Sequence, residues 1–420
     1  MRIWRVPFPK FGAGPGLDRV ARLGNRLGVD LAGFGARGAV IVGSNGKGST
    51  AAMTAALLQQ VNGPVGLFTS PHLFVLNERF RIDGVEISDQ ELQHHWARVA
   101  AAAKAAGVEA QFGGFEFLFL IAADWFAARS CVHTLWEAGI GGRLDPVRLI
   151  AARRLALTSL DLEHTELLGT TLEGIARDKL DAAPAGARVF VGASCLLLRE
   201  VIEAHCAARG VIAEFLDANF SISSPQEQGQ ASVFADLALA GAHQRDNAAL
   251  AVSLARAMAN LSESDIRAGL AATRWPGRLE TINDDPLIVI DVGHTPAAVR
   301  AALEGFKSMR GARAGVLVCG TSNGKRSGDM IAMLAPDFGA IICTAARHKG
   351  AAPAAIAAYA SAANHSAELM LAESVAEARR LALARARGSG AAIYVAGGLF
   401  LAAEFKAVQL GRDPASLVFF

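Results

Sequence analysis

Short apolar runs rich in β-branched residues alternate with longer alanine-rich stretches along this chain of 420 residues, and the alternation limits the possible folds more than any other feature. A short apolar run bounded by turn residues is typical of a strand buried on both faces, whereas a long alanine-rich stretch is typical of a helix. The expected strands cover residues 38–42, 65–68, 133–136, 155–158, 188–191, 287–290, 314–319, 340–343 and 392–395, and the first clear helix follows at roughly 49–60. Strands that alternate with helices predict an α/β protein whose mostly parallel sheets are covered on both faces.

The series of strands restarts after Pro276, Gly277 and Arg278, which favour a turn between two structural units. We therefore expect an N-terminal domain over residues 1–276 with a mostly parallel sheet. A hinge or linker over 277–285 and a smaller, Rossmann-like α/β domain over 286–420 complete the expected organisation. The chain length is consistent with two or three domains at about 150 residues each.

The charge and hydropathy of the chain exclude several classes of partner. The 41 basic and 39 acidic residues give a net charge of +2, without the basic excess or clustering typical of nucleic-acid binding. No apolar run reaches the roughly 18 residues that a membrane-spanning helix needs, and the first residues lack the apolar stretch of a signal peptide. The 5 cysteines are scattered without a CxxC spacing, which is typical of buried thiols in a reducing compartment. We expect a cytoplasmic protein that binds neither nucleic acid nor a membrane.

The strongest local motif is GSNGKGST at residues 43–50, between the first expected strand and its helix. Glycines allow backbone N–H groups to close around phosphate oxygens, and the N-terminus of the following helix favours anions. Lys47 would neutralise the β- and γ-phosphates, and Ser49 or Thr50 would reach a phosphate or its Mg²⁺. The residues expected to bind ATP here are Gly43, Asn45, Gly46, Lys47, Gly48, Ser49 and Thr50. The alternative is a glycine-rich turn without a ligand, since the spacing departs from the generic phosphate-loop pattern.

A series of further motifs resembles the bifunctional dihydrofolate synthase/folylpolyglutamate synthase family of the Mur ligase superfamily. Besides the loop at 43–50, the matching segments are GLDRV at 16–20, TSPHL at 69–73, NERFRIDG at 77–84, FE at 115–116, EAGIGGRLD at 137–145, DLEHT at 161–165, HQRDN at 243–247, PGR at 276–278 and DVGH at 291–294. They occur in the order of the family. The resemblance implies that 1–276 is a P-loop ATPase-like, ATP-binding central domain and that 286–420 is the C-terminal ligase domain.

This resemblance implies an ATP-dependent acid–amino-acid ligase that forms an amide bond through an acyl phosphate. Its expected substrates are a folate- or pterin-like carboxylate and an amino acid, L-glutamate in the family, and its expected state is a monomer. Ser70, Glu137 and His164 would hold Mg²⁺, with two ions expected, and Lys179 matches a lysine that carries a carbamate. Lys47, Lys179 and His294 would be the catalytic residues.

The remaining site residues are also implied by the resemblance. Asn247, Arg278 and Asp291 match nucleotide-contacting positions. Phe115, Glu116, Arg143, Leu144 and Asp145 match the side that binds the acceptor acid. Taken singly, these residue types favour ordinary structural roles, because acidic residues at strand ends often cap helices and a lone lysine usually lies in solvent.

The chain departs from the family pattern mainly on the acceptor side. Residues 178–182 read DKLDA where the family has EKAGI, 144–148 read LDPVR for LDATN, and 291–296 read DVGHTP for DGAHNP. Residues 1–15 contain no readable helix ahead of the GLDRV segment. These differences leave two alternatives open: a paralogous ligase acting on a different acid or amino acid, and a nucleotide-binding regulatory protein without turnover.

Overall fold

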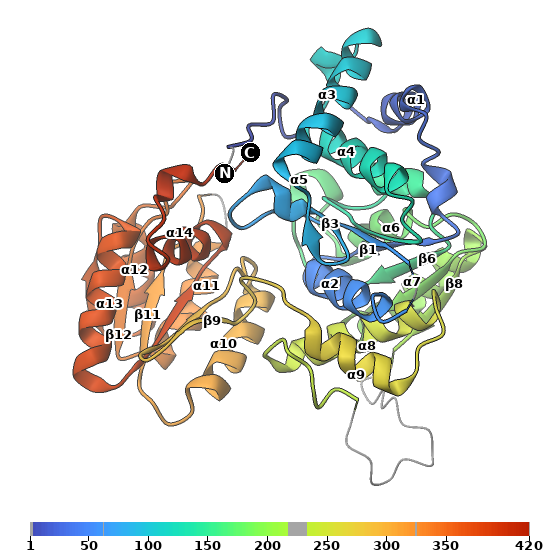
Figure 1. Cartoon of the computed structure of the whole chain (residues 1–420). Helices are drawn as coiled ribbons and strands as arrows, with labels where there is room; N and C mark the ends of the chain where they lie inside the picture. Colours follow the sequence, from blue (N-terminus) through green and yellow to red (C-terminus); the bar gives the residue numbers. More distant parts are fainter. Residues whose placement is uncertain (1–2, 62, 217–232, 324–325, 420) are drawn as a thin grey trace, which may run out of the picture.

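Two sheets, each covered by helices on both faces, form two lobes that lie side by side (Figure 1). The computed structural model describes residues 3–61, 63–216, 233–323 and 326–419. The first lobe contains the blue to yellow elements of Figure 1 and the second contains the orange and red ones. The expected α/β class with mostly parallel sheets is confirmed.

The first sheet has eight strands in the order β4-β3-β2-β5-β1-β6-β7-β8. Its strands are β1 (Gly38–Val42), β2 (Val65–Phe68), β3 (Phe80–Ile82), β4 (Val85–Glu86), β5 (His133–Glu137), β6 (Arg154–Leu157), β7 (Arg188–Val191) and β8 (Ile212–Phe215). All neighbours pair in parallel except β2 with β3 and β3 with β4, which form the antiparallel edge. Strand β1 therefore ends between the carboxyl ends of β5 and β6, which is where ligands bind in open α/β sheets.

The second sheet has six strands in the order β13-β12-β11-β14-β10-β9. Its strands are β9 (Glu280–Asp284), β10 (Leu287–Ile290), β11 (Gly315–Cys319), β12 (Ala340–Cys343), β13 (Glu368–Leu371) and β14 (Ala392–Ala396). Only β9 runs antiparallel to its neighbour. Because β9 pairs with β10, residues 280–284 belong to the second sheet. The expected linker at 277–285 is therefore placed too far along the chain. The segment without regular structure between the lobes is 273–279.

Helices cover both faces of each sheet. In the first lobe they are α1 (Leu17–Leu27), α2 (Lys47–Leu58), α3 (Asp89–Ala105), α4 (Gly114–Ala128), α5 (Thr165–Leu168), α6 (Leu172–Leu180), α7 (Arg199–Ala208), α8 (Ala242–Arg256) and α9 (Glu263–Ala272). In the second lobe they are α10 (Pro296–Arg310), α11 (Ser327–Leu334), α12 (Pro353–Ala363), α13 (Val375–Ser389) and α14 (Leu399–Gln409). None of the helices in the described part of the chain combines the length and hydrophobicity that crossing a bilayer requires.

Alternate side chains of β1 point to opposite faces of the sheet and pack in two different cores. Ala39 and Ile41 pack in a core with α2, α8 and α9, whereas Val40 and Val42 pack in a second core with α1, α3 and α4. All of these side chains are fully buried, so the strand is apolar throughout its length. The phenylalanine side chains at 112, 117, 119 and 126 are fully buried in this second core, whereas Phe115 is only partly buried.

Candidate active site

The loop at 43–50 leaves the carboxyl end of β1 and turns directly into α2, which begins at Lys47 rather than near residue 49. Gly46 adopts a left-handed conformation with φ 84°, and a Cβ placed there would lie 2.4 Å from Oδ1 of Asn247 on α8. A Cβ on Gly48 would similarly lie 2.9 Å from the indole nitrogen of Trp275. The glycines thus allow α8 and the segment before the second lobe to approach the loop closely.

The end of β6 fixes the shape of this loop. Thr158 Oγ1 and Ser159 Oγ donate to the carbonyl oxygen of Asn45 at 2.6 and 3.0 Å, and the Asn45 amide donates to Ser159 Oγ at 2.8 Å. Lys47 Nζ donates to the carbonyl oxygens of Gly43 and Ser44 at 2.7 and 3.3 Å. The Lys47 ammonium group therefore already lies over the loop that would receive the phosphates.

Two hydroxyl groups at the start of α2 are buried without a hydrogen-bond partner among the described residues. They are Ser49 Oγ and Thr50 Oγ1. A buried hydroxyl that lacks a partner is costly unless a ligand completes it. Their position in the first turn of α2 matches a site for phosphate oxygens or for a hydrated cation.

Lys179 from α6 reaches the same loop. Its side chain is 1% exposed, and its ammonium group donates to Glu163 Oε1 at 2.9 Å and to the Gly43 carbonyl oxygen at 3.1 Å. Burial and the nearby Lys47 charge lower the pKa of Lys179. Burial tends to raise the pKa of Glu163, but the charges of Lys47 and Lys179 bring it below its usual value. The charged pair is therefore a buried part of the phosphate loop and not a solvated surface pair.

Glu137 at the end of β5 accepts a hydrogen bond from the Ser70 amide at 2.9 Å, which links two of the expected metal ligands. Burial raises the pKa of Glu137, while Lys47, Arg278 and Arg79 act on it as neighbouring positive charges. The Glu137 carboxylate is therefore close to three cations: Lys47 in the loop, Arg79 just before β3 and Arg278 in the segment between the lobes.

Arg278 connects the lobes electrostatically. Burial lowers its pKa, and the carboxylates of Asp291 and Glu137 oppose that shift. Asp291 follows β10, and its two oxygens accept from the amides of Gly293 and Leu279 at 2.7 and 3.1 Å. The structure thus brings together Arg278 of the segment between the lobes, Asp291 of the second lobe and Glu137 of the first lobe.

A hydrogen bond joins the second lobe directly to the phosphate loop. Thr295 Oγ1, which caps α10, donates to Asn45 Oδ1 at 3.3 Å. His294 precedes it, is partly buried, and has Nδ1 3.4 Å from the carbonyl oxygen of Val292. The hydroxyl that replaces the family's amide at position 295 is therefore an interlobe contact.

The expected acceptor-side residues divide into structural and exposed groups. Both oxygens of Glu116 bind Arg19, at 2.6 and 2.8 Å, and Asp145 accepts from the amides of Gly139, Ile140 and Val147 at 2.8 to 3.1 Å. Burial raises the pKa of Asp145 to about 6. Glu116 and Asp145 thus hold the surrounding backbone in place.

The other three expected acceptor-side residues are more accessible. Phe115 contacts Phe68 and is partly buried, Leu144 is 44% exposed, and Arg143 donates to Asp178 Oδ2 at 3.2 Å. Of the five expected residues, only these three present accessible surface on the acceptor side.

The expected metal ligands fit a hard divalent cation by their chemistry. Glu137 supplies a carboxylate and Ser70 a hydroxyl, the oxygen donors that Mg²⁺ prefers, and the orphaned Ser49 hydroxyl adds a third. His164 follows Glu163 in a left-handed turn with φ 46°, and its Nδ1 lies 3.6 Å from Oε1 of Glu166. Within the described ranges, no three His, Cys, Asp or Glu side chains cluster as a ready metal site. Phosphate and water oxygens would have to complete the coordination.

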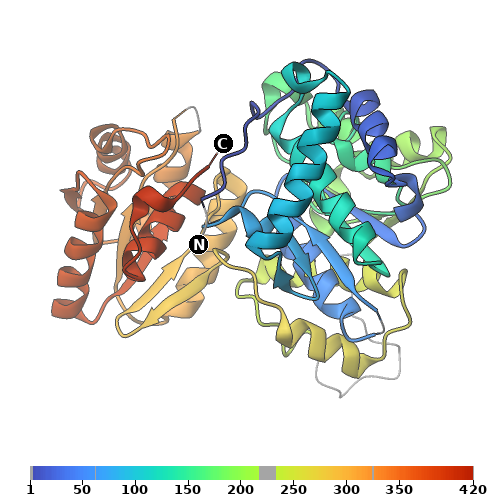
Figure 2. The same ribbon diagram turned by 45° about the horizontal axis from the view of Figure 1, so that its top comes forward.

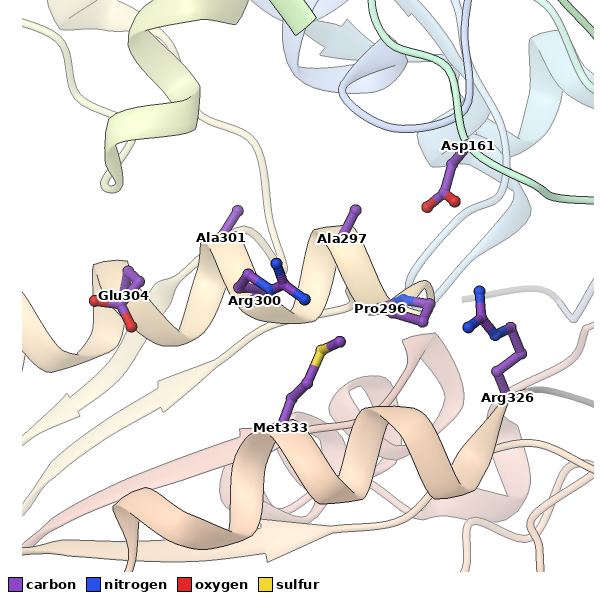
Figure 3. A pocket seen from close by; sticks show the side chains of 8 residues that line it. All are labelled: Asp161, Pro296, Ala297, Arg300, Ala301, Glu304, Arg326 and Met333. Atoms are coloured by element: carbon purple, nitrogen blue, oxygen red, sulfur yellow. The ribbon is translucent and has the colours of Figure 1, made fainter. Parts of the chain in front are cut away.

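A pocket of about 560 Å³ opens between Asp161 of the first lobe and helices α10 and α11 of the second (Figure 3). Asp161, whose backbone amide donates to Ser44 Oγ at 3.0 Å, lines it from the first lobe. Arg300 of α10 and Arg326, next to α11, line it from the second lobe, with Met333 on its floor. One oxygen of Asp161 is buried without a partner among the described residues.

Comparison with known proteins assigns the family. A family model described as "Mur ligase, glutamate ligase domain" matches residues 277–399. The dihydrofolate synthase/folylpolyglutamate synthase of Bacillus subtilis is 31% identical over 73% of this chain and 75% of its own length. The chain belongs to the dihydrofolate synthase/folylpolyglutamate synthase family. A probable bifunctional folylpolyglutamate synthase/dihydropteroate synthase of Halobacterium salinarum is 32% identical over 70% of this chain, which spans 38% of that longer protein.

Solved structures of folylpolyglutamate synthases share the architecture of both lobes. That of the Mycobacterium tuberculosis enzyme, complexed with ADP and AMPPCP, aligns with a TM-score of 0.85 at 26% identity over 95% of this chain and 96% of its own. A bifunctional folylpolyglutamate synthase/dihydrofolate synthase with Mn, AMPPNP and L-glutamate bound aligns with a TM-score of 0.78 at 25% identity over 97% and 99% of the two chains. The resemblance found in the motifs is confirmed.

Several residues that shape this folylpolyglutamate synthase-like site carry no local sequence signal of their role. Glu163, Thr158 and Thr295 act on the phosphate loop from segments more than 100 residues away from it in sequence. Glu78 accepts from three successive amides at 73–75, and its place inside the NERFRIDG segment does not indicate that role. Spacing alone does not identify such contacts.

Proposed function

We propose that this protein is an ATP-dependent ligase that joins L-glutamate to a folate or pterin carboxylate. The observation that carries the proposal is the convergence of Lys47 and Lys179 on the Gly43 carbonyl oxygen, with Glu137 and Arg278 facing the same region. Two ammonium groups at a glycine loop suit a polyphosphate, and the guanidinium of Arg278, in the segment between the lobes, suits charge that develops during transfer. The relatives whose names state this activity support the choice.

The reaction transfers the γ-phosphoryl group of ATP to a carboxylate oxygen and releases ADP. The amine then attacks the carbonyl carbon of the acyl phosphate, a proton leaves the nitrogen, and phosphate departs as the C–O bond breaks. Lys47 and Arg278 would stabilise the charge on the transferring group, and Asn247 and Asp291 would hold the nucleoside. His294 would orient the reacting groups from the second-lobe side of the cleft. Positioning and charge stabilisation are the main contributions of the protein.

Ser70, Glu137 and His164 would hold a divalent cation, which supplies charge neutralisation between the phosphates. The structures of relatives that contain Mn together with AMPPNP support this assignment. A second ion and a carbamate on Lys179 extend the proposal. The carbamate would exchange the ammonium group seen in this structure for a carboxylate that serves the second ion, and Lys47 would keep its charge for the phosphates. Burial lowers the pKa of Lys179, which favours the neutral amine that CO₂ requires. Labelled bicarbonate would give a carbamate carbon signal in the protein if the modification forms.

The interlobe pocket suits the incoming amino acid. Asp161 offers a carboxylate for an ammonium group, and Arg300 offers a guanidinium group for a carboxylate. Arg326, which pairs with Asp329, and Glu304, which pairs with Lys307, add one charge of each sign to the lining. A dicarboxylic amino acid also carries both signs of charge and so complements this lining, whereas an apolar amine does not. The structure of a relative with L-glutamate bound supports this choice of amine.

Product analysis tests the proposal. The protein would be incubated with ATP, Mg²⁺ and glutamate, with dihydropteroate, tetrahydrofolate or other carboxylic acids offered separately, and the products read by mass spectrometry. A glutamyl adduct of a pterin substrate is expected. An adduct formed only with another acid would favour the paralogous ligase, the alternative that the altered residues 144–148 leave open. Nucleotide binding without any adduct would favour the regulatory alternative.

A further inference from the structure

The loop after β2, which contains Ser70, is embedded in the second lobe. Leu73 is 5% exposed and packs in a core cluster made otherwise of second-lobe residues, among them Ile290 and Val292. Phe74 beside it lies under Lys406 and Arg412, at 5.3 and 5.2 Å from its ring centre. A loop of the first lobe thus ends among side chains of the second.

Residues 417–419, which we call the strap, close over this loop from the second lobe. Val418 accepts a hydrogen bond through its carbonyl oxygen from His72 Nε2 at 2.8 Å. The Phe419 ring stacks on the His72 ring with centroids 5.6 Å apart and planes 11° apart, and it also contacts His348 and Phe400. In Figure 2 the last red segment leaves the second lobe and runs toward the first.

The contacts of His72 fix both of its ring nitrogens. Arg79 Nε donates to His72 Nδ1 at 3.0 Å, so Nδ1 is the acceptor and Nε2 carries the hydrogen that Val418 receives. His72 is 3% exposed, so both hydrogen bonds lie away from bulk solvent. The side chain is therefore a fixed connection between the strap and Arg79.

Arg79 carries this connection to the expected metal site. Arg79 is buried, and its carbonyl oxygen accepts a hydrogen bond from the amide of Thr69 at 3.0 Å. The next amide along the chain, that of Ser70, donates to Glu137 Oε2 at 2.9 Å. Residues that hold metal ligands from behind set the orientation of those ligands. The order strap, His72, Arg79, the Thr69–Ser70 backbone and Glu137 therefore runs from the second lobe to two expected ligands.

We propose that His72 is a positioning residue and that the strap, through His72 and Arg79, sets the geometry of the Ser70–Glu137 cation site. This inference rests on the proposed function for the identity of that site. It couples the placement of the second lobe to the affinity for the cation, because the strap can reach His72 only when the lobes are held together.

The test measures Mn²⁺ affinity in the complex of the full chain with a non-hydrolysable ATP analogue, by electron paramagnetic resonance. Phe419→Ala removes the stacking ring, and His72→Phe keeps a ring while removing both hydrogen bonds. We expect either change to weaken Mn²⁺ binding by roughly tenfold, with nucleotide affinity in the absence of metal unchanged. Phe419→Tyr should retain the wild-type value. Tyr359→Ala, an exposed ring on α12 of the same lobe, is the matched control.

Unchanged Mn²⁺ affinity in Phe419→Ala, accompanied only by a lower melting temperature, would show that the strap is merely structural. An unchanged value in His72→Phe would overturn the connection through Arg79. The same loss in Tyr359→Ala would overturn the specificity of the effect. The Mn²⁺ titration needs no turnover, so its result does not depend on ligase activity. A protein that forms no adduct with any acid would contradict the proposed function, and the effect of the strap on Mn²⁺ affinity could still be measured.

Discussion

At the scale of single residues, the carbonyl oxygen of Gly43 is the meeting point of two ammonium groups. Lys47 and Lys179 both donate to it, at 2.7 and 3.1 Å, and Glu163 binds Lys179 from the other side. Like charges held this close are unfavourable unless an anion compensates them. In this structure the Glu163 carboxylate compensates part of the positive charge of the two lysines. A bound phosphate would compensate the rest, so the two ammonium groups favour an anion at this loop.

Removal of one of these charges tests the phosphate loop. Lys47→Ala should reduce kcat by about a hundredfold or more, because the charge stabilises the transferring group more than the bound nucleotide. Phosphate release measured under saturating ATP checks this. Lys104→Ala, at the end of α3, is the control and should keep wild-type turnover. Ordinary ligase activity in Lys47→Ala would overturn the assignment.

The variant Glu137→Gln tests cation binding separately from nucleotide binding. The amide keeps the size of the side chain and can still accept from the Ser70 amide, but it loses the charge that a cation requires. The Mg²⁺ concentration at half-maximal turnover should rise about tenfold, with nucleotide affinity changed far less. An unaltered Mg²⁺ titration would show that Glu137 has no role as a ligand.

Arg300 tests the pocket for the amino acid. It lies exposed on α10, so its replacement should not affect folding. Arg300→Ala should raise the KM for glutamate by about ten- to a hundredfold, the usual cost of an unpaired carboxylate, and leave the KM for ATP unchanged. Arg310→Ala at the far end of the same helix is the control. An equal rise in both constants would contradict a dedicated amino-acid pocket.

At the scale of elements, the start of α2 depends on backbone freedom at Gly46. The left-handed φ of 84° turns the chain from the loop into the helix, and Asn247 occupies the space where a Cβ would lie. Sequence propensity places the start of this helix near residue 49, because glycines at 46 and 48 usually weaken helices. In the structure the turn geometry overrides propensity, and α2 begins at Lys47.

Gly46→Ala should therefore lower both stability and nucleotide affinity. The left-handed conformation alone costs about 1–2 kcal/mol for a residue with a Cβ, and the clash with Asn247 adds to it. Thermal unfolding and nucleotide titration check the two effects. Gly339→Ala is the control, since no atom lies within 4 Å of the place that its Cβ would occupy and its φ is unremarkable. Equal behaviour of the two variants would contradict the role of Gly46.

The sequence predicts the central strands well and the edges poorly. Central strands such as β1 and β11 are buried on both faces, so their apolar runs are unmistakable. The edge strands β4, β8 and β13 are partly exposed, and β9 carries polar residues, so none of them has such a run.

The site shows the same division between local and distant signals. Lys47 and the glycines follow from a local motif, whereas the contact of His72 with Val418 joins residues 346 positions apart. No spacing in the sequence indicates a contact of that kind.

At the scale of the whole molecule, the two lobes meet at the phosphate loop and at the strap. Thr295 binds Asn45 on one side of the cleft, and the strap holds His72 on the other. Arg278 lies close to carboxylates of both lobes. The groups proposed to bind phosphate, cation and amino acid lie around the cleft that these contacts define. The proposed reaction would therefore depend on the placement of the lobes as much as on any side chain.

In the proposed reaction the cleft activates a carboxylate as an acyl phosphate. To test this step, a pterin acid labelled with oxygen-18 in its carboxylate would be incubated with ATP, Mg²⁺, glutamate and the protein. The mechanism requires one labelled oxygen to leave with each phosphate as the amide forms. Mass spectrometry of the inorganic phosphate should therefore show one oxygen-18 atom per molecule of glutamyl product. Product formed with unlabelled phosphate would contradict the acyl-phosphate mechanism.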